Sequence, residues 1–380
     1  MALNRAVAVL GSTGSIGRQT LDVAQRLGMR VASLAAGRSV RETEAQARQF
    51  CPDVAALYDE EAARDLKVRL ADTSVRVLGG AEGVDEAARL GDIAVNGIVG
   101  IRGLSPTLAA LDAGHPAALA NKETLVCAGE IVRRRAAERG VRILPVDSEH
   151  SAVFQCLQGN ERALFRVILT CSGGAFYGKS RAETYGMTRH EALRHPNWRM
   201  GEKITVDCAT LMNKGLECIE AMRLFGVGID RVEVLIHRES VVHSMIELAD
   251  GAVLAQLGVP DMRLPIQYAL TWPERAPCPA EPLRLAGRTL SFALPDTEAF
   301  PCLALARRAA ARSDAACAIL NGANEQAVAR FLREEIVFGQ IAEAVEYALE
   351  TVPECAPESV EDVYALDRAA RETADAFLSR

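Results

Sequence analysis

The sequence predicts an α/β protein with an N-terminal doubly wound parallel sheet, a central α/β domain and a C-terminal helical bundle. Three observations support this prediction. Apolar, strand-like runs alternate with amphipathic helical runs over residues 1–150, a glycine-rich loop follows the first of these runs, and helical periodicity dominates after Pro301. Alternating strands and helices are typical of a parallel sheet, because the chain must cross back over the sheet between strands. A chain of 380 residues is also too long for one ordinary core, so we expect two or three domains.

Apolar runs of the N-terminal region are predicted to be the strands of this sheet. They are Val7–Leu10, Val31–Ala35, Val54–Tyr58, Ile93–Val95, Ala117–Ala120 and Val141–Leu144. Helical patterns lie between them, as in Thr20–Leu27, Val40–Phe50 and Leu104–Ala113. A second region opens near residue 151 and contains the further strand-like runs Val167–Thr170, Val232–His237 and Val253–Leu257. Its middle, about residues 173–203, is too irregular to assign, and the prolines crowded between residues 273 and 282 indicate a linker.

Composition and charge argue against several classes of protein. The chain is 49% hydrophobic and 24% charged, as soluble globular proteins are. A net charge of -7 without a basic block argues against nucleic-acid binding. The first residues lack the apolar region of a secretory signal, and no apolar run reaches membrane-spanning length, so no membrane association is expected. The 10 cysteines form no Cys-x-x-Cys pair, which indicates reduced thiols in a cytoplasmic protein.

The segment Gly11–Gly17 has the context of a dinucleotide-binding loop. It follows a short apolar strand, opens a helix and has the glycine spacing G-x-x-G-x-x-G. Glycines permit a tight turn and close backbone approach, and the N–H groups of the helix face a pyrophosphate. Because this spacing is a variant of the G-x-G-x-x-G fingerprint, a simple tight turn stays an open alternative. The context favours a Rossmann-like domain.

The end of the second predicted strand indicates which dinucleotide binds. A site for NAD usually has Asp or Glu there to bind the ribose 2′-hydroxyl. Here Gly37, Arg38 and Ser39 occupy that place, with no acid among them. Arg38 can receive a 2′-phosphate and Ser39 can add a hydrogen bond, although a surface arginine in a loop is the alternative. The sequence therefore predicts NADP(H).

Two carboxylates and a histidine lie together in the run Pro145–His150, directly after an apolar run. If the backbone is extended there, Asp147 and Glu149 project from the same side of a strand end. Like charges this close repel unless a cation lies between them, and hard divalent cations prefer oxygen ligands. The alternative, a polar turn that closes a strand, is favoured if the run is considered alone.

A second cluster lies in Asp207–Glu217, which is typical of the entry and first turns of a helix. Asn213 lies four residues before Glu217 and Lys214 three residues before it, so we expect all three on one helix face. Glu217 can complete a site of three carboxylates for Mg²⁺ or Mn²⁺, and Asn213 and Lys214 can hold an anionic, hydroxylated ligand. An ordinary Lys–Glu surface pair is the alternative.

Three shorter segments add polar groups. Asn121–Glu123 ends a strand-like run and should face the cofactor crevice, unless it is only a helix N-terminus with a salt bridge. Ser172–Gly174 offers a hydroxyl and backbone N–H groups in the manner of an anion nest. His195–Gly201 combines a histidine, an indole and a thioether in a loop that can close over a ligand. Its alternative is an irregular loop pinned by one buried tryptophan.

Together these segments resemble the 1-deoxy-D-xylulose 5-phosphate reductoisomerase family over essentially the full length. The family's blocks occur in order at Gly11–Gly17, Ala120–Glu123, Pro145–His150, Ser172–Gly174, His195–Trp198, Asn213–Glu217 and Val253–Met262. The resemblance implies an NADPH- and divalent-metal-dependent oxidoreductase of the non-mevalonate (MEP) isoprenoid precursor route. Such an enzyme rearranges the phosphosugar 1-deoxy-D-xylulose 5-phosphate and reduces the product to 2-C-methyl-D-erythritol 4-phosphate.

The resemblance also implies a role for each site residue. The implied metal ligands are Asp147, Glu149 and Glu217, and the implied catalytic set adds Lys122 and His150, the latter as a supporting or proton-transfer group. The implied substrate contacts are Lys122, Ser148, Glu149, Ser172, His195, Asn213, Lys214 and Glu217. The implied cofactor contacts are Thr13, Gly14, Ser15, Ile16, Gly37, Arg38, Ser39, Asn121, Glu123 and Gly201. Trp198 and Met200 are implied to belong to a flexible flap.

The changes of pattern along the chain, together with this resemblance, predict how the chain is divided. We expect an NADPH-binding domain over 1–147, a catalytic and connective domain with the metal site and flap over 148–272, a linker over 273–300 and a helical domain over 301–380. The family is typically a homodimer, and we expect the same here.

Two rival interpretations fit part of the sequence. A simple NADP-dependent aldehyde or alcohol dehydrogenase explains the glycine-rich loop but gives Asp147, Glu149 and Glu217 no purpose. A redox-sensing NADP-binding module without chemistry predicts that these carboxylates are missing, and all of them are present.

The chain departs from the family pattern around the phosphate end of the predicted site. Arg38–Ser39 stands where Lys-Asn is usual, which keeps the positive charge. Cys171 replaces a glycine, and Cys208 replaces a serine that contacts the substrate phosphate in the family. A thiol is a weaker hydrogen-bond donor than a hydroxyl.

We therefore predict that Cys208→Ser lowers the Michaelis constant for the phosphosugar, because a hydroxyl donates a stronger hydrogen bond to phosphate. Steady-state kinetics of the wild type and the variant at saturating NADPH test this prediction. An unchanged or higher Michaelis constant in the variant rejects it.

Overall fold

A computed structural model describes residues 5–194 and 200–380, and no helix among them is long and apolar enough to cross a membrane. The chain forms two compact units, which are described separately. The first unit contains Met1–Thr124, Val132–Ser151 and Asp261–Ala280. The second unit contains Leu125–Ile131, Ala152–Pro260 and Glu281–Arg380. The four-part division expected from the sequence stays a prediction.

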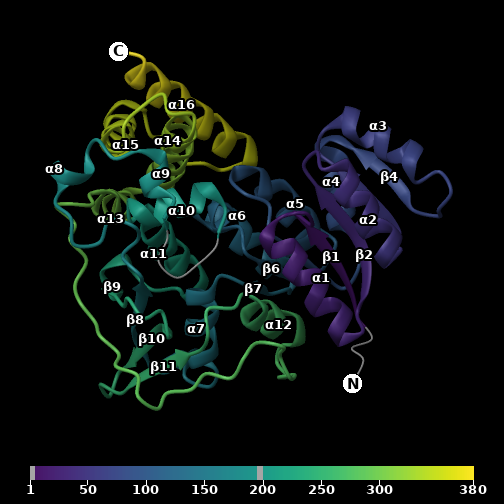
Figure 1. Cartoon of the computed structure of the whole chain (residues 1–380), viewed down its shortest axis with the longest axis horizontal. Helices are drawn as coiled ribbons and strands as arrows, with labels where there is room; N and C mark the ends of the chain where they lie inside the picture. Colours follow the sequence, from purple (N-terminus) through teal and green to yellow (C-terminus); the bar gives the residue numbers. More distant parts are fainter. Residues whose placement is uncertain (1–4, 195–199) are drawn as a thin grey trace. The chain divides into compact units, whose positions relative to one another are not determined.

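The first unit is built on a seven-stranded parallel sheet with the order β4-β3-β2-β1-β5-β6-β7. Its strands are β1 (Ala6–Leu10), β2 (Arg30–Ala36), β3 (Val54–Leu57), β4 (Arg76–Gly79), β5 (Ile93–Asn96), β6 (Ala117–Leu119) and β7 (Ile143–Pro145). After β4 the chain returns to the middle of the sheet, so the strand order reverses between β1 and β5 (Figure 1). Doubly wound sheets bind ligands at this switch point, beyond the carboxyl ends of the strands.

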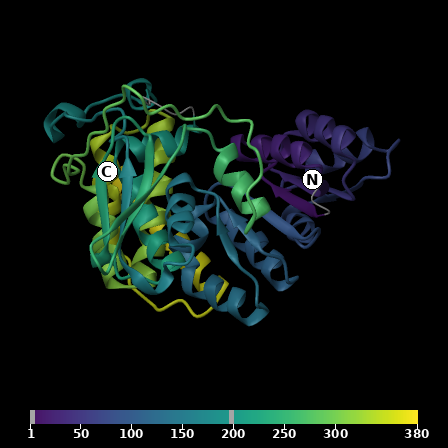
Figure 2. The same cartoon turned by 90° about the horizontal axis from the view of Figure 1, so that it is seen from below.

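Helices connect these strands and cover the sheet. They are α1 (Ser15–Leu27), α2 (Val40–Phe50), α3 (Glu60–Arg69), α4 (Gly80–Ala88), the 3₁₀ turn η1 (Ile101–Gly103), α5 (Leu104–Asp112), α6 (Lys122–Arg139), α7 (Ser148–Leu157) and α12 (Arg263–Thr271). The division between the units falls within α6 and α7, so both helices belong partly to each unit. α12 packs against α1 and contacts β6 and β7, and Figure 2 shows it beside the purple N-terminal helix. A segment late in the sequence therefore completes the first unit.

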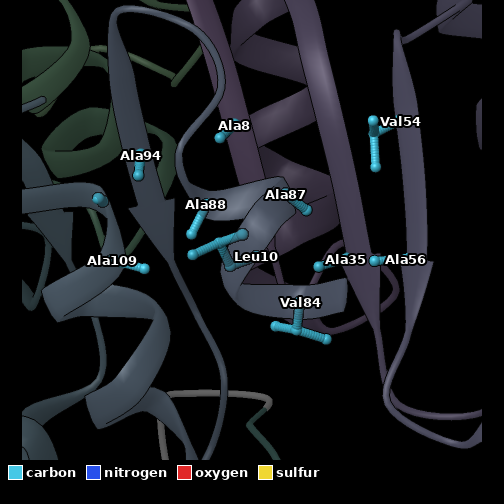
Figure 3. Packing of buried hydrophobic residues seen from close by; sticks show 11 residues of the cluster. Ala8, Leu10, Ala35, Val54, Ala56, Val84, Ala87, Ala88, Ala94 and Ala109 are labelled. Atoms are coloured by element: carbon cyan, nitrogen blue, oxygen red, sulfur yellow. The ribbon is translucent and has the colours of Figure 1, made fainter. Parts of the chain in front are cut away.

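Small side chains form the core between α4 and the sheet. Val84, Ala87 and Ala88 of α4 are buried against the strands, together with Leu10 of β1 and Ala35 of β2 (Figure 3). Alanines carry only one side-chain carbon, so the helix can approach the strands closely without leaving voids. The continuous apolar sequences of β1, β2, β3 and β5 follow from burial on both faces of the sheet.

The second unit contains a four-stranded mixed sheet and a group of helices. The strands are β8 (Leu164–Cys171), β9 (Val232–Ile236), β10 (Val242–Leu248) and β11 (Val253–Leu257), in the order β11-β10-β8-β9. Its helices are α8 (Arg181–Thr184), α9 (Arg189–Ala192), α10 (Glu202–Ala209), α11 (Met212–Phe225), α13 (Cys302–Arg312), α14 (Asp314–Leu332), α15 (Gly339–Thr351) and α16 (Val360–Leu378), with 3₁₀ turns η2 (Glu161–Ala163) and η3 (Ile229–Arg231). α11 packs on β8 and β9, and α14 packs against α13, α15 and α16 (Figure 1).

The predicted α/β fold class is confirmed, but several local predictions were wrong. β4 and β10 were missed, because polar side chains interrupt their apolar character. The backbone after β7 is not extended, since α7 begins at Ser148. Asp207 and Cys208 do not open the helix of Glu217, because they belong to the preceding helix α10. The segment 173–203 contains the short helices α8 and α9, each started by a Ser/Thr-x-x-Glu capping box that the sequence already carried.

Candidate functional site

The glycine-rich loop joins β1 to α1 at the switch point of the first unit. Gly11 has φ +80°, and a Cβ added there would lie 2.8 Å from the backbone of Gly97 after β5. A Cβ added at Gly17 would lie 2.3 Å from the carbonyl oxygen of Gly11. The loop is therefore tight against two strand ends, and no larger residue fits at either position. Between these glycines lie the predicted cofactor residues Thr13, Gly14, Ser15 and Ile16.

The N-terminus of α1 is suited to an anion. Gly14 is the N-cap and has no side chain to satisfy the first N–H groups, and the first turn contains no acidic residue. The helix dipole adds partial positive charge at this end. A pyrophosphate placed there would meet backbone donors and no carboxylate from the first turn of the helix.

The loop after β2 places Gly37, Arg38 and Ser39 at the same edge of the sheet, all of them exposed. Within the described part of the chain Arg38 has no ion-pair partner, in contrast to many other arginines of this acidic protein. The loop is fixed by hydrogen bonds from the following strand end, because Asp59 N donates to Gly37 O at 3.0 Å. Arg38 is thus an exposed, unneutralised cation on a fixed loop, at the edge where doubly wound sheets bind the ribose of a dinucleotide.

Asn121 organises the loop after β6. Its Oδ1 caps α6 by accepting from Thr124 N at 3.0 Å. Its Nδ2 donates to Ile98 O at 2.7 Å and to Gly100 O at 2.8 Å, and also to Glu123 Oε2 at 3.0 Å. Asn121 therefore holds the loop after β5 as well as the start of α6. Both the capping role and a place beside the cofactor crevice fit this geometry.

Lys122 forms a buried ion pair in the first unit. Its Nζ lies 2.9 Å from Asp147 Oδ2, and Lys122 is only 5% exposed. A buried charge without a partner is strongly unfavourable, so the pair stabilises both ions in the folded chain. The ends of β6 and β7 thus bring together a lysine and a carboxylate that are both predicted site residues.

The run Asp147–His150 starts α7. Asp147 Oδ1 accepts from Glu149 N at 3.1 Å, as an N-cap carboxylate does. Ser148 Oγ donates to Glu149 Oε2, and the fully buried His150 has Nδ1 at 3.4 Å from Asp147 Oδ1. The predicted proximity of Asp147 and Glu149 exists, but a helix turn produces it instead of an extended strand end.

The cluster on α11 lies in the second unit. Asn213 Nδ2 donates to Glu217 Oε1 at 2.5 Å, and Lys214 forms an ion pair with Glu217 Oε2. All three are buried, with Glu217 only 1% exposed. The neighbouring Cys218 is also buried, which raises the pKa of its thiol to about 12 and keeps it neutral. The shared helix face that the spacing predicts is present, and it is not an exposed surface pair.

The loop after β8 forms a nest in the second unit. Gly173 has φ +79° and Gly174 has φ +71°, and Gly174 N donates to Ser172 Oγ at 3.3 Å. A Cβ added at Gly174 would lie 2.3 Å from Cys208 O, so this loop contacts the end of α10. The half-buried Cys208 therefore lies beside the nest that could receive a phosphate.

Sequence reasoning missed two residues that hold this region. Arg238 Nη1 donates to Ser172 O at 2.6 Å and to Gly174 O at 3.2 Å. Asn324 of α14 donates from Nδ2 to Asp207 Oδ1 at 2.9 Å. Neither has a local sequence signal, because each contact joins segments far apart in the chain.

Asp207 is a buried carboxylate with two partners in the same unit. Lys203 Nζ lies 2.9 Å from Asp207 Oδ2, and Asn324 occupies the other oxygen. The network supports the turn between α10 and α11, where Leu211 adopts φ +61° although it is not a glycine. A leucine in this conformation needs surrounding contacts that fix it.

The remaining predicted residues lie around the start of α10. Gly201 is the exposed N-cap of α10, and Met200 is half-buried. His195 and Trp198 lie outside the described residues.

We predict that Asn324→Ala lowers the free energy of unfolding by about 1.5–3 kcal/mol, because it removes a buried hydrogen bond to the Asp207 carboxylate. Urea denaturation of the purified protein measures the change. Glu372→Ala, at an exposed side chain of α16 in the same unit, is the control and should change stability by less than about 0.5 kcal/mol. Equal stability of the two variants would show that the Asp207–Asn324 bond contributes nothing net.

Comparison with known protein families gives one consistent result. Three domain families match: 1-deoxy-D-xylulose 5-phosphate reductoisomerase over residues 7–129, its C-terminal domain over residues 143–225, and the DXP reductoisomerase C-terminal domain over residues 257–373. Together they cover most of the chain.

Similar proteins carry the same name. The chain is 48% identical to the 1-deoxy-D-xylulose 5-phosphate reductoisomerase of Thermosynechococcus vestitus, over 99% of this chain and 94% of that protein. It is 51% identical to the enzyme of Desulfitobacterium hafniense, over 88% of this chain and 89% of that protein.

Solved structures of the same family have the same fold as this chain. The Zymomonas mobilis enzyme in complex with NADPH superimposes with a TM-score of 0.92 at 43% identity, over 99% of both chains. A reductoisomerase in complex with NADPH, fosmidomycin and magnesium superimposes with a TM-score of 0.94 at 39% identity, over 99% of this chain and 98% of that one.

Proposed function

Because this chain belongs to the 1-deoxy-D-xylulose 5-phosphate reductoisomerase family, we propose that it converts 1-deoxy-D-xylulose 5-phosphate into 2-C-methyl-D-erythritol 4-phosphate with NADPH. The reaction uses a divalent cation, Mg²⁺ or Mn²⁺. The observation that carries the proposal is the buried Lys122–Asp147 pair, which lies at the carboxyl edge of a sheet that also bears the glycine-rich loop and Arg38. A simple dehydrogenase needs the loop but leaves the carboxylates Asp147, Glu149 and Glu217 without a purpose.

The proposed metal ligands are Asp147, Glu149 and Glu217. All three are carboxylates, the hard oxygen donors that Mg²⁺ and Mn²⁺ prefer, and each is held by defined hydrogen bonds or ion pairs. When bound, the cation supplies Lewis-acid polarisation of the substrate's carbonyl oxygen. The donor chemistry therefore fits the proposed ion.

The chain's own residues bind and orient the two organic ligands. The α1 N-terminus with Thr13–Ile16 binds the pyrophosphate of NADPH, and Arg38 with Ser39 binds its 2′-phosphate. Gly37, Asn121, Glu123 and Gly201 complete the proposed cofactor contacts. Lys122 and Lys214 attract the anionic substrate, because their positive charges partly offset the proposed carboxylate ligands.

The proposed phosphate end of the substrate site lies in the second unit. Ser172 and the nest glycines offer a hydroxyl and backbone N–H groups. Ser148, Asn213 and His195 are the other proposed substrate contacts, and His150 is proposed as a supporting or proton-transfer group behind Asp147. Trp198 and Met200 are proposed to belong to a flap over the ligand.

We also propose that the protein is a cytoplasmic homodimer. The edge strand β11 exposes Val253 (51%) and Leu254 (37%), and the segment 281–294 exposes Leu285, Phe292 and Leu294. An apolar edge strand left open invites pairing with another chain, so a second copy is the occupant we propose. The cysteines among the described residues form no disulfide, which fits a cytoplasmic protein.

The assay that tests the proposed reaction follows NADPH absorbance after 1-deoxy-D-xylulose 5-phosphate and Mg²⁺ are added. We expect oxidation that requires substrate and metal, stops when EDTA is added and returns with excess Mg²⁺ or Mn²⁺. No metal-dependent oxidation would contradict the proposal.

A pair of matched variants separates metal binding from general damage. Glu217→Gln removes a proposed ligand charge and should lower the rate by at least about 100-fold. Glu233→Gln, on β9 of the same unit, removes a carboxylate with no proposed role and should retain the wild-type rate. Equal rates for both variants would remove Glu217 from the ligand set.

We predict that the double substitution Val253→Glu with Leu254→Glu converts the dimer into a monomer, because charges on β11 oppose pairing of the edge. Size-exclusion chromatography with light scattering measures the mass. Val68→Glu, at a 76% exposed position of α3, is the control and should stay dimeric. A monomeric wild type would rule out the dimer, and a dimeric double variant would place its interface elsewhere.

A further inference from the structure

An arginine and a tyrosine from separate loops of the first unit stack on each other at the carboxyl edge of the sheet. The guanidinium carbon of Arg102, in η1 after β5, lies 4.9 Å from the centroid of the Tyr58 ring, directly after β3. Tyr58 is 41% exposed and Arg102 is exposed as well. The pair is therefore accessible to a ligand.

The position of this pair follows from the strand order. β3 and β5 are separated by β2 and β1 in the sheet, so a contact between the loops after β3 and β5 passes over the ends of β2 and β1. Those ends carry Arg38 and the glycine-rich loop. The pair thus lies over the part of the sheet where the adenosine half of a dinucleotide binds.

The backbone segments that carry both partners are fixed before any ligand arrives. Tyr58 N donates to Ala36 O at 2.9 Å, which ties Tyr58 to the end of β2. The loop that carries Arg102 is held by Asn121, through Ile98 O and Gly100 O. A further hydrogen bond runs from Asn96 Nδ2 of β5 to the Gly103 carbonyl at 2.8 Å. A surface fixed in this way loses little freedom when a ligand binds.

The chemistry of the pair suits a purine ring. Arg102 forms no ion pair with any described residue, so its guanidinium is not committed to a carboxylate. Val99, three residues earlier in the same loop, is 68% exposed and adds apolar surface. A planar guanidinium stacks on aromatic rings from either side, so a base can stack on the face turned away from Tyr58.

We infer that Arg102, backed by Tyr58, is the stacking surface for the adenine ring of the cofactor. This inference rests on the proposed use of NADPH and adds the residues that bind its base. With this assignment, Arg38 and Arg102 bind different parts of the cofactor. Arg38 recognises the 2′-phosphate, and Arg102 recognises the ring that NADPH and NADH share.

Binding of cofactor fragments to the full-length protein tests this assignment. Calorimetry or fluorescence titration gives dissociation constants for NADPH, NADH, adenosine 2′,5′-bisphosphate and reduced nicotinamide mononucleotide. We expect Arg102→Ala to weaken NADPH, NADH and adenosine 2′,5′-bisphosphate by about tenfold each and to leave the mononucleotide unchanged, because stacking on a base is lost. Tyr58→Ala should act in the same direction.

Further variants separate stacking from charge and from general damage. Arg102→Lys keeps the charge without the planar group and should weaken binding almost as much as alanine. Arg38→Ala should weaken NADPH and the bisphosphate but not NADH. Arg134→Ala, at an exposed arginine of α6, is the control and should bind all ligands as the wild type does.

The other possible binding results would each reject the assignment of Arg102 and Tyr58. Wild-type affinities in Arg102→Ala and Tyr58→Ala would overturn the assignment while leaving the proposed function intact. Loss of NADPH but not NADH binding in Arg102→Ala would make Arg102 a phosphate ligand and reject stacking. A wild type that binds neither NADPH nor the bisphosphate would overturn the proposed function, and the assignment with it.

Discussion

The parallel alignment of the strands in the first unit is the constraint on which its proposed site depends. Parallel strands end at the same edge, so loops from distant sequence positions meet there. β1 ends at the glycine-rich loop, β2 at Arg38, β6 at Asn121 and β7 at Asp147. No side chain has to reach far, since the sheet places each group within one or two residues of a strand end. The pairing of the strands thus positions the proposed chemistry.

Lysine–carboxylate pairs with at least one buried partner recur in both units. Lys122 pairs with Asp147, Lys214 with Glu217 and Lys203 with Asp207, each within a single unit. Such pairs are a poor source of stability, because desolvation of both ions offsets their attraction. We therefore relate these three pairs to function rather than to stability. Each pair holds a carboxylate in a defined position, where it can meet a cation or orient a substrate.

Patterns within short stretches of the sequence predicted those strands and side-chain pairs that depend on neighbouring residues. Apolar runs gave β1, β2, β3 and β5 because these strands are buried on both faces, and the three- and four-residue spacing placed Lys214 beside Glu217. Asp147 was misjudged because its short polar side chain caps a helix as readily as it ends a strand. Contacts such as Asn324 with Asp207 or Arg102 with Tyr58 could not be predicted, since they depend on which segments the fold brings together.

Asn121 shows why the structural and the functional interpretation of a residue need not compete. One amide caps α6, fixes the loop that carries Arg102 and places Lys122 at the first position of the helix. If it were replaced, the lysine beside Asp147 and the arginine over Tyr58 would both lose their support. A residue whose hydrogen bonds all serve the fold can therefore be essential to the site, because those hydrogen bonds hold the site residues in place. The sequence left open the alternative that Asn121–Glu123 is only a helix N-terminus. That helix N-terminus is present, and it is the structure that holds the proposed site.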